Sequence, residues 1–239
     1  MDISGITEVQ DAFYENELIS AFSVSSPATV QWSADFVPPI TEVSRNRIVK
    51  IDSCLSSKVL FIDSNDTVRL LGTTSLFNWN IRTEQGHKIG SLSRNLLGTE
   101  YTLKNRQENK EVCFIKHFGL YSNTGPRVFN VYTNSKDTLY KLNLSERVKK
   151  KKNQYIRLQN KPPYFSYETN SYVLNFNGRV TMPSTRNFQI IHPKDTSFIT
   201  MTFGKTSHNE YILDYTYPWS GMEAFGVALS SFGSILGID

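Results

Sequence analysis

The chain has 239 residues, 39% of them hydrophobic and 13% aromatic, which is enough for one large β domain or two small ones to bury a sizeable core. Lys and Arg exceed Asp and Glu by 26 − 22 = 4, so the surface has only a mild bias toward phosphate-bearing partners. The two cysteines, Cys54 and Cys113, have no metal-binding spacing, which predicts free thiols in a reducing compartment.

The amino-terminal segment differs from the rest of the chain. Residues 1–17 are rich in acidic side chains and have no apolar core of the kind a secretory signal needs, so we expect cytosolic or nuclear residence. A short helix fits residues 11–22, and a linker of small residues follows. We therefore expect residues 1–35 to be peripheral or partly disordered and residues 36–239 to form the principal domain.

Short β-rich runs separated by polar turn clusters predict strands through the principal domain. About a dozen such runs precede a single terminal helix, which is the inventory of a mainly β protein. The predicted strands cover residues 47–51, 58–62, 67–71, 78–82, 87–92, 100–104, 111–117, 127–133, 155–159, 172–176, 187–192, 197–203 and 211–215.

The last predicted element is a helix that is apolar on every side. Ser220 and Glu223 have the spacing of a capping box, so the helix is expected to begin near Gly221. One face of the helix carries Met222, Phe225, Leu229, Phe232 and Leu236, and the other carries Ala224, Val227, Ala228, Ile235 and Ile238.

A helix without a polar stripe must lie in a protein core or in lipid. A membrane span needs about 20 apolar residues, whereas this run is shorter and contains Ser230, Ser231 and Ser234. A core helix has to be surrounded by the strands, which a flat sheet cannot do. The sequence therefore predicts a mainly β (α+β) fold, a closed antiparallel barrel of about twelve strands around a central hydrophobic C-terminal helix.

Several motifs carry a family resemblance. Residues 159–193 contain YVLNF, NGRV and NFQIIHP, an FGK follows at 203–205, and residues 214–232 read DYTYPWSGMEAFGVALSSF. Upstream, KIGSLSRNLLGTEYTL at 88–103 and GPR at 125–127 match further segments. From about residue 36 to the end, the chain resembles the carboxy-terminal domain of Tubby-family proteins. That resemblance implies a closed twelve-stranded barrel threaded by a hydrophobic helix.

The resemblance also implies phosphoinositide recognition. Tubby-like domains dock on phosphatidylinositol 4,5-bisphosphate at the plasma membrane, and some members enter the nucleus or deliver cargo to cilia. The expected function is a non-catalytic module that associates with anionic membrane surfaces and tethers or traffics protein cargo. The expected location is cytoplasmic and peripheral to the plasma membrane, with the nucleus or cilium as further destinations. No cofactor or metal is implied.

The resemblance implies a set of headgroup-binding residues. The family site uses a Lys and an Arg two residues apart on one strand, with a nearby Asn, because a doubly phosphorylated ring needs converging cationic donors. Here Ser91 and Ser93 occupy the two cation positions, Asn78 keeps the Asn, and Arg94 is the nearest cation. Since strand side chains alternate between faces, Arg94 is expected to point away from the face that the two serines share. Arg127 of the GPR motif completes the phosphoinositide-binding set.

Other basic residues leave alternatives open. Arg82, Lys88 and Lys104 can compensate for the missing cation pair or remain solvated surface charges. Arg179 of the NGRV motif is expected to form a structural ion pair. A cluster in a predicted loop provides an auxiliary basic patch near anionic membranes, a nuclear-import address, or simply a solvated loop. It consists of Arg147, Lys149, Lys150, Lys151 and Lys152.

No motif indicates catalysis. The chain has no nucleophile elbow, no phosphate-binding loop and no zinc helix, and its histidines lack metal-like spacing. Nucleic acid is a disfavoured partner because the aromatic residues do not interleave with the basic run. Two hypotheses remain: the lipid-binding module, or a protein-interaction scaffold or nuclear factor that has lost specific phosphoinositide binding.

Overall fold

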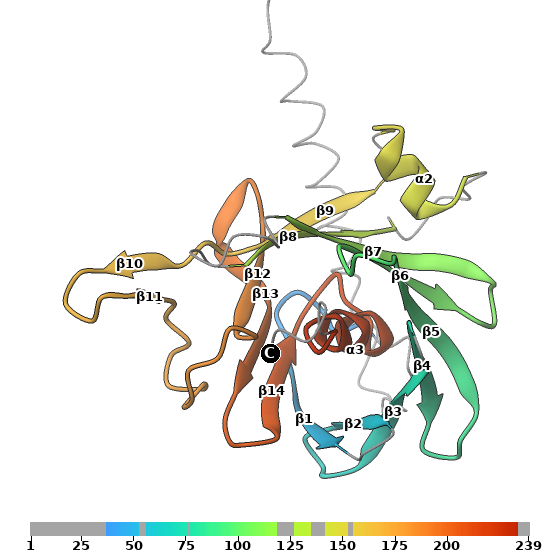
Figure 1. Cartoon of the computed structure of the whole chain (residues 1–239), viewed down its shortest axis with the longest axis horizontal. Coiled ribbons are helices and arrows are strands. Elements are labelled where there is room, and N and C mark those ends of the chain that lie inside the picture. The colour runs from blue at the N-terminus through green and yellow to red at the C-terminus, as the bar shows by residue number, and fades with distance from the viewer. Residues whose placement is uncertain are drawn as a thin grey trace, which may run out of the picture.

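The chain folds around α3 (Gly221–Ser230), which lies inside a ring of strands (Figure 1). The computed structural model describes residues 37–52, 56–75, 77–118, 127–134, 142–152 and 155–233. The strands of the ring are β1 (Ser44–Asp52), β2 (Ser57–Ile62), β3 (Val68–Ser75), β4 (Asn78–Thr83), β5 (Lys88–Arg94), β6 (Glu100–Asn105), β7 (Lys110–Phe118), β8 (Val128–Thr133), β9 (Ile156–Asn160), β12 (Phe188–His192), β13 (Asp195–Lys205) and β14 (Glu210–Tyr215).

These strands form a closed barrel among the described residues. Their order is β1-β14-β13-β12-β9-β8-β7-β6-β5-β4-β3-β2, and all neighbouring strands are antiparallel. The predicted barrel of about twelve strands around a C-terminal helix is confirmed. The predicted helix at 11–22, the segment 1–35 and Cys54 lie outside the described residues, while Cys113 is a buried free thiol.

A capping box starts α3 where the sequence predicts it. The Ser220 hydroxyl accepts a hydrogen bond from the Glu223 backbone N–H at 3.2 Å, and the Glu223 carboxylate accepts one from the Ser220 N–H at 3.0 Å. The α-helix ends at Ser230 and a turn continues to Gly233, where the Ser230 and Ser231 hydroxyls bond to backbone carbonyls one turn back. The predicted continuation through Leu236 and Ile238 lies outside the described residues.

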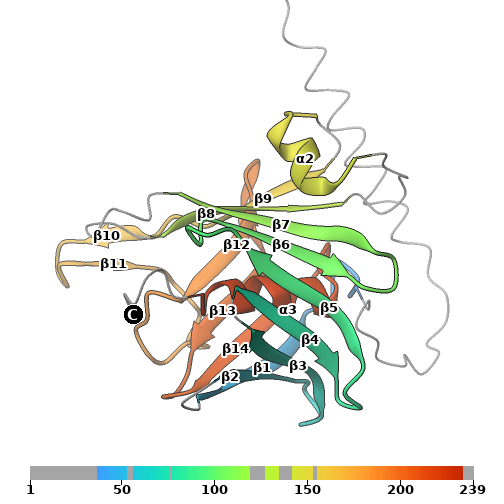
Figure 2. The same cartoon turned by 45° about the vertical axis from the view of Figure 1, so that its right-hand side comes forward.

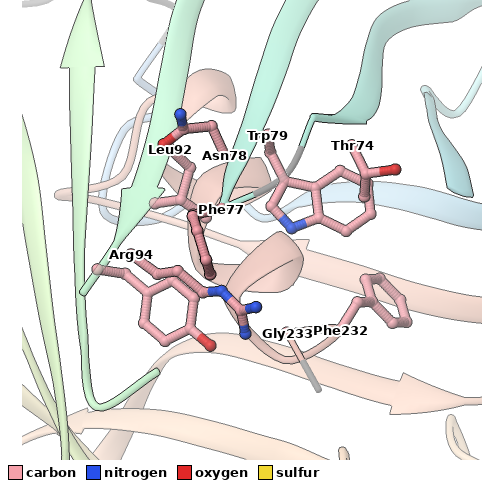
Figure 3. Close-up of a pocket in the computed structure, with 9 residues that line it drawn as sticks. Thr74, Phe77, Asn78, Trp79, Leu92, Arg94, Phe232 and Gly233 are labelled. Carbon is pink, nitrogen blue, oxygen red and sulfur yellow. The ribbon is translucent and has the colours of Figure 1, made fainter. Parts of the chain in front are cut away.

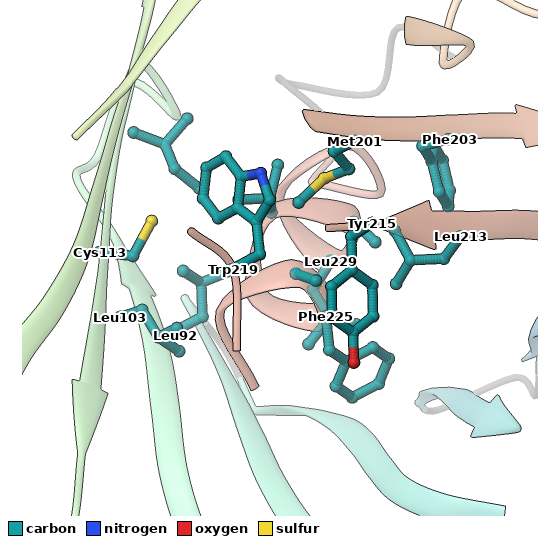
Figure 4. Packing of buried hydrophobic residues seen from close by; sticks show 14 of the residues in the cluster. Leu92, Leu103, Cys113, Met201, Phe203, Leu213, Tyr215, Trp219, Phe225 and Leu229 are labelled. Carbon is teal, nitrogen blue, oxygen red and sulfur yellow. The ribbon is translucent and has the colours of Figure 1, made fainter. Parts of the chain in front are cut away.

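Both apolar faces of α3 are buried against the barrel wall (Figure 4). Phe225 packs edge-on against Phe61 of β2, with ring centroids 5.7 Å apart. The helix approaches β6 closely at Gly226, where a Cβ atom would lie only 2.8 Å from Leu103. The barrel interior is therefore a filled core in which the helix replaces the side chains of a smaller barrel.

One predicted barrel strand lies elsewhere. The strand expected at 172–176 is instead β11 (Ser171–Val173), which pairs with β10 (Tyr164–Ser166) in a two-stranded hairpin that projects from the barrel (Figure 2). The chain leaves the barrel after β9 at Pro162 and Pro163, which have no N–H to continue a ladder. β11 ends at Val173, and the chain then turns at Asn177 and Gly178, which adopt positive φ.

The prediction that the basic cluster lies in a loop is also wrong. Residues 144–149 form a short helix, α2 (Leu144–Lys149), on the outside of the barrel over β7 and β8 (Figure 1). Helical spacing places Leu144 and Val148 together, where they pack on Phe114 and Tyr132. This apolar contact, rather than helix propensity, orders the segment.

The Arg179 ion pair is confirmed. Its guanidinium donates to both carboxylate oxygens of Asp214 on β14, at 2.7 to 2.9 Å. Burial raises the pKa of Asp214 and the Arg179 charge opposes that rise. The pair fixes the 177–179 turn to the barrel wall, so Arg179 has a structural role.

We expect Phe225→Ala to lower the free energy of unfolding by about 3 to 5 kcal/mol, because it removes a fully buried ring and leaves a cavity. Phe198→Ala is the control, since Phe198 on β13 is partly exposed, and it should cost about 1 kcal/mol. Urea unfolding measures both values. Equal losses would contradict a core position for α3.

Candidate functional site

The barrel wall brings three of the predicted headgroup residues onto one outer face. Asn78 on β4 lies directly opposite Ser93 on β5, and Ser91 lies two residues further along the same strand. The intervening residues Trp79 and Leu92 are buried, so they face the interior. Asn78, Ser91 and Ser93 therefore form a contiguous polar strip on the outside of the barrel.

Two exposed lysines flank this strip. Lys104 on β6 pairs with Ser91, so it lies one strand spacing, about 4.8 Å, from it. Asn80 lies on the other side of Ser91, and the row continues through Thr73 to Lys58 on β2. Lys104 is thus the predicted compensating cation that the structure places beside the serines. Arg82 instead donates to the Gly86 carbonyl at 3.0 Å.

Lys88 lies beyond a bulge in β5. It pairs with Arg82 after a register shift between Ile81 and Arg82, so the simple alternation from Ser91 does not apply to it. A β-bulge therefore lies between Lys88 and the polar strip. It lies at the turn that joins β4 to β5.

Arg94 lies on the other side of the wall, as the one-residue offset predicts. It lines a cavity of about 100 Å³ at the end of the barrel where α3 terminates (Figure 3). Its guanidinium lies 5.5 Å from the centroid of the Phe77 ring, a cation–π contact. Asn78, Trp79 and Tyr101 also line this cavity, so Asn78 is the residue that the outer strip and the cavity share.

Arg127 belongs to the inner group rather than to the outer strip. It immediately precedes β8, and its carbonyl accepts a hydrogen bond from Asn160 at 2.9 Å. Burial lowers the pKa of His117, and the Arg127 charge lowers it further. Burial raises the pKa of Tyr101, and the charges of Arg94 and Arg127 oppose that rise. Arg94 and Arg127 therefore converge on Tyr101 at the mouth of the barrel.

The auxiliary basic patch loses one member. Arg147 is only 2% exposed, and its guanidinium donates to the Leu142 carbonyl at 3.3 Å and to the Asn134 side chain. The prediction that Arg147 belongs to an exposed patch is wrong, because the helical turn directs it inward beside Leu144. Arg147 instead fixes α2 to the barrel.

The four lysines of the patch are exposed. Lys149 reaches Glu100 at the start of β6, with 2.9 Å between Nζ and a carboxylate oxygen, and lies 5.8 Å from the Phe114 ring centroid. Phe114 pairs with Thr102, which pairs with Ser93, so about two strand spacings separate α2 from the polar strip. Lys150, Lys151 and Lys152 continue the chain at the end of α2.

Metal and membrane-span features are not found in the part of the chain that the structure describes. No group of three or more His, Cys, Asp or Glu side chains there could hold a metal ion. Likewise, none of the described helices has the length and apolarity needed to cross a bilayer.

The fold and the outer strip define a barrel-and-helix module with a polar candidate site on its wall. The family model described as "Tub family" matches residues 73–234, and the chain belongs to this family. It is 34% identical over 185 residues to Tubby-related protein 3 of Homo sapiens, covering 63% of this chain and 40% of that protein.

Shorter matches have higher sequence identity. The chain is 53% identical over 75 residues to Tubby protein homolog 1 of Caenorhabditis briggsae, covering 31% of this chain and 18% of that protein. A solved structure of an Arabidopsis thaliana protein aligns with a TM-score of 0.43 and 11% identity, covering 86% of this chain and 96% of that one. The chain thus spans less than half the length of the curated relatives it matches.

Sequence reasoning missed the inner cavity. Phe77, Trp79 and Tyr101 meet Arg94 through the pairing of β4, β5 and β6, and Phe232 and Gly233 after α3 complete the lining. The register of β5 against β6 pairs Arg94 with Tyr101. Sequence reasoning could have found this contact only by predicting that register.

His117 predicts a pH dependence of stability. Burial first, and then the Arg127 charge, lower the pKa of His117 to about 4, against 6.5 for an unperturbed histidine. The unfolded chain therefore takes up a proton near pH 6.5, while the folded chain does so only near pH 4. The unfolding free energy should fall by about 3 kcal/mol as pH decreases through this window, and His117 should contribute nothing to the slope above it.

We expect His117→Phe to flatten the stability profile between pH 6.5 and 4, because Phe fits among the neighbouring rings of Tyr101 and Phe129 without a titrating group. His208→Gln in the exposed turn before β14 should retain the wild-type slope. Urea unfolding at a series of pH values measures both. An unchanged slope in His117→Phe would refute the assignment.

Proposed function

We propose that this protein is a non-catalytic module that binds phosphoinositide headgroups in anionic membrane surfaces and thereby tethers or traffics protein cargo. The observation that carries the proposal is the outer strip of Asn78, Ser91 and Ser93 with Lys104 beside it. Membership of the Tub family supports it, since the resemblance implies phosphatidylinositol 4,5-bisphosphate as the ligand.

The strip alone is a weak anion site. Hydroxyl and amide groups donate single neutral hydrogen bonds, whereas each cation to a phosphate adds a charge-assisted bond worth about 1.5 to 3 kcal/mol. Lys104 is the only cation paired directly with the two serines or Asn78 among the described strands. The proposal therefore needs further positive charge nearby.

Lys149 at the end of α2 and the three lysines that follow it supply that charge. Residues 149–152 are all exposed, and α2 is held on the barrel wall by Leu144 and Arg147. A lysine near an anionic bilayer contributes about 1 kcal/mol. The rigid mounting of α2 keeps these charges within reach of the surface that the strip faces.

We expect the triple variant Lys150→Glu, Lys151→Glu, Lys152→Glu to bind vesicles containing phosphatidylinositol 4,5-bisphosphate on the order of a hundredfold more weakly than wild type. The matched control replaces the same lysines with arginine and should retain binding, because it keeps the charge. Vesicle co-sedimentation at physiological salt gives the affinities. Equal binding by the Glu and Arg variants would remove the patch from the proposal.

Restoring the family's cation pair tests the strip itself. Ser91→Lys with Ser93→Arg should tighten binding to the same vesicles on the order of a hundredfold, because two charge-assisted bonds form on one face. Ser91→Asn with Ser93→Gln is the neutral control and should change little. If the charged variant gained equally on vesicles lacking the phosphoinositide, the strip would be only a non-specific charge site.

A protein-interaction scaffold is the second candidate, and one observation favours it. The projecting β10–β11 hairpin carries Phe165 in edge contact with Tyr167 and Tyr172, at 5.2 and 5.3 Å between ring centroids, and Tyr167 is 91% exposed. Exposed aromatic clusters are typical of protein-binding surfaces. Wild-type protein that binds vesicles equally with and without the phosphoinositide would favour this candidate.

A further inference from the structure

Exposed apolar side chains gather at the end of the barrel where α3 terminates. Alternate turns of an up-and-down barrel share one end, so the β3–β4 and β5–β6 turns lie there together with the end of β7 and the start of β8. These parts of the chain carry Phe77, Leu96, Leu97, Phe118 and Val128, which are between 40% and 80% exposed. We refer to these five residues as the apolar rim.

Backbone hydrogen bonds make the rim one continuous arc. The Arg94 N–H donates to the Phe77 carbonyl at 3.2 Å, which joins the first connection to the second. The His117 N–H donates to the Thr99 carbonyl at 2.8 Å, which joins the second to β7, and Phe118 pairs directly with Val128. The rim residues are therefore neighbours on one surface.

The central turn of the rim is rigid. The Asn95 side-chain oxygen accepts hydrogen bonds from the N–H groups of Thr99 and Glu100, at 2.8 and 3.1 Å. Gly98 adopts a φ of 66°, which an L side chain rarely adopts. This turn holds Leu96 and Leu97 outward, so their exposure is built into the loop.

Cations lie directly behind the apolar tips. Arg94 stacks on Phe77, and the Lys116 ammonium lies 5.8 Å from the centroid of the Phe118 ring. Arg127 precedes Val128. The acid of this region, Glu100, lies within 4.0 Å of both Lys116 and Lys149 and is thereby neutralised. The described residues of the rim region therefore have a positive balance.

We propose that the apolar rim inserts into the interface of an anionic bilayer, with Arg94, Lys116 and Arg127 at the level of the headgroups. This inference rests on the proposed function and states how the module sits on the membrane. A layer of separate apolar tips above a layer of cations matches the depth profile of such an interface, where side-chain stems lie in the acyl boundary and charges remain among phosphates.

The proposed orientation on the membrane also relates the rim to the cavity, the polar strip and α2. The cavity that Arg94 lines opens beside Phe77 (Figure 3), and the polar strip begins at Asn78, one residue further along. Lys149 reaches Glu100 at the base of the central turn. With the rim in the interface, the strip and the α2 lysines stand next to the headgroup layer.

An environment-sensitive fluorophore tests insertion directly. It is attached at Leu96→Cys in a Cys54→Ser background of the full chain, where Cys113 is fully buried and unreactive. The same probe at Val43→Cys is the control, since Val43 is exposed beside Ser44 at the opposite end of the barrel. Phosphatidylcholine vesicles with phosphatidylinositol 4,5-bisphosphate should shift the emission at position 96 to the blue and leave position 43 unchanged.

Affinity supplies the second measurement. The double variant Leu96→Gln, Leu97→Gln should bind these vesicles about tenfold more weakly, because two leucines no longer leave water, whereas Val43→Gln should bind like wild type. Both sites are exposed, so the variants should fold, which thermal unfolding verifies.

The outcomes separate the two proposals. Wild-type protein that binds no vesicle refutes the proposed function and the insertion together. Wild-type protein that binds phosphoinositide vesicles with no shift at position 96 and no loss in the double variant overturns the insertion alone. A shift at position 96 that rises with protein concentration in the absence of vesicles would assign the rim to contact with a second copy and would also overturn it.

Discussion

Burial of α3 is the constraint on which the rest of the structure depends. The helix offers apolar side chains in every direction, so it is stable only when the wall encloses it completely. The sheet must be closed to enclose the helix, and in a closed sheet each strand residue faces either the interior or the outside. At Gly72 and Gly226 the helix and wall approach so closely that a Cβ atom would meet Leu229 or Leu103 at about 3 Å, which shows how tightly the two are fitted.

That assignment of faces determines the chemistry of the candidate site. Ser91 and Ser93 share the outer face with Asn78, while Arg94 turns into the barrel mouth toward Tyr101. One wall thus separates a neutral polar strip from an inner group of cations. The two surfaces meet at Asn78, near the end where α3 terminates. In the proposed orientation, a membrane that meets that end of the barrel lies near both surfaces, so the proposals for the rim and for the strip agree in geometry.

Much of the fold follows from local patterns in the sequence, and the exceptions have identifiable causes. The capping-box spacing of Ser220 and Glu223 predicted the start of α3. The alternation of strand side chains predicted that Arg94 points to the other face of the sheet from Ser91 and Ser93. Arg147 could not be placed because α2 is too short to show a period, and its burial comes from tertiary partners such as Asn134. Leu96 and Leu97 resemble core leucines in the sequence, and only the geometry of the β5–β6 turn reveals that they face outward. Sequence therefore predicts the residues of the candidate site, whereas contacts across the barrel determine which charges lie beside them.

The most direct test of this account is hydrogen exchange of the α3 backbone under native conditions. If the enclosed helix holds the barrel together, the amides of Phe225 to Leu229 exchange only when the whole molecule unfolds. Their opening free energy should then equal the global value from urea unfolding and that of the neighbouring strands β5 and β6. Exchange of these amides at a markedly lower opening free energy than the strands would mean that the barrel stands without its helix, and the central claim would be wrong.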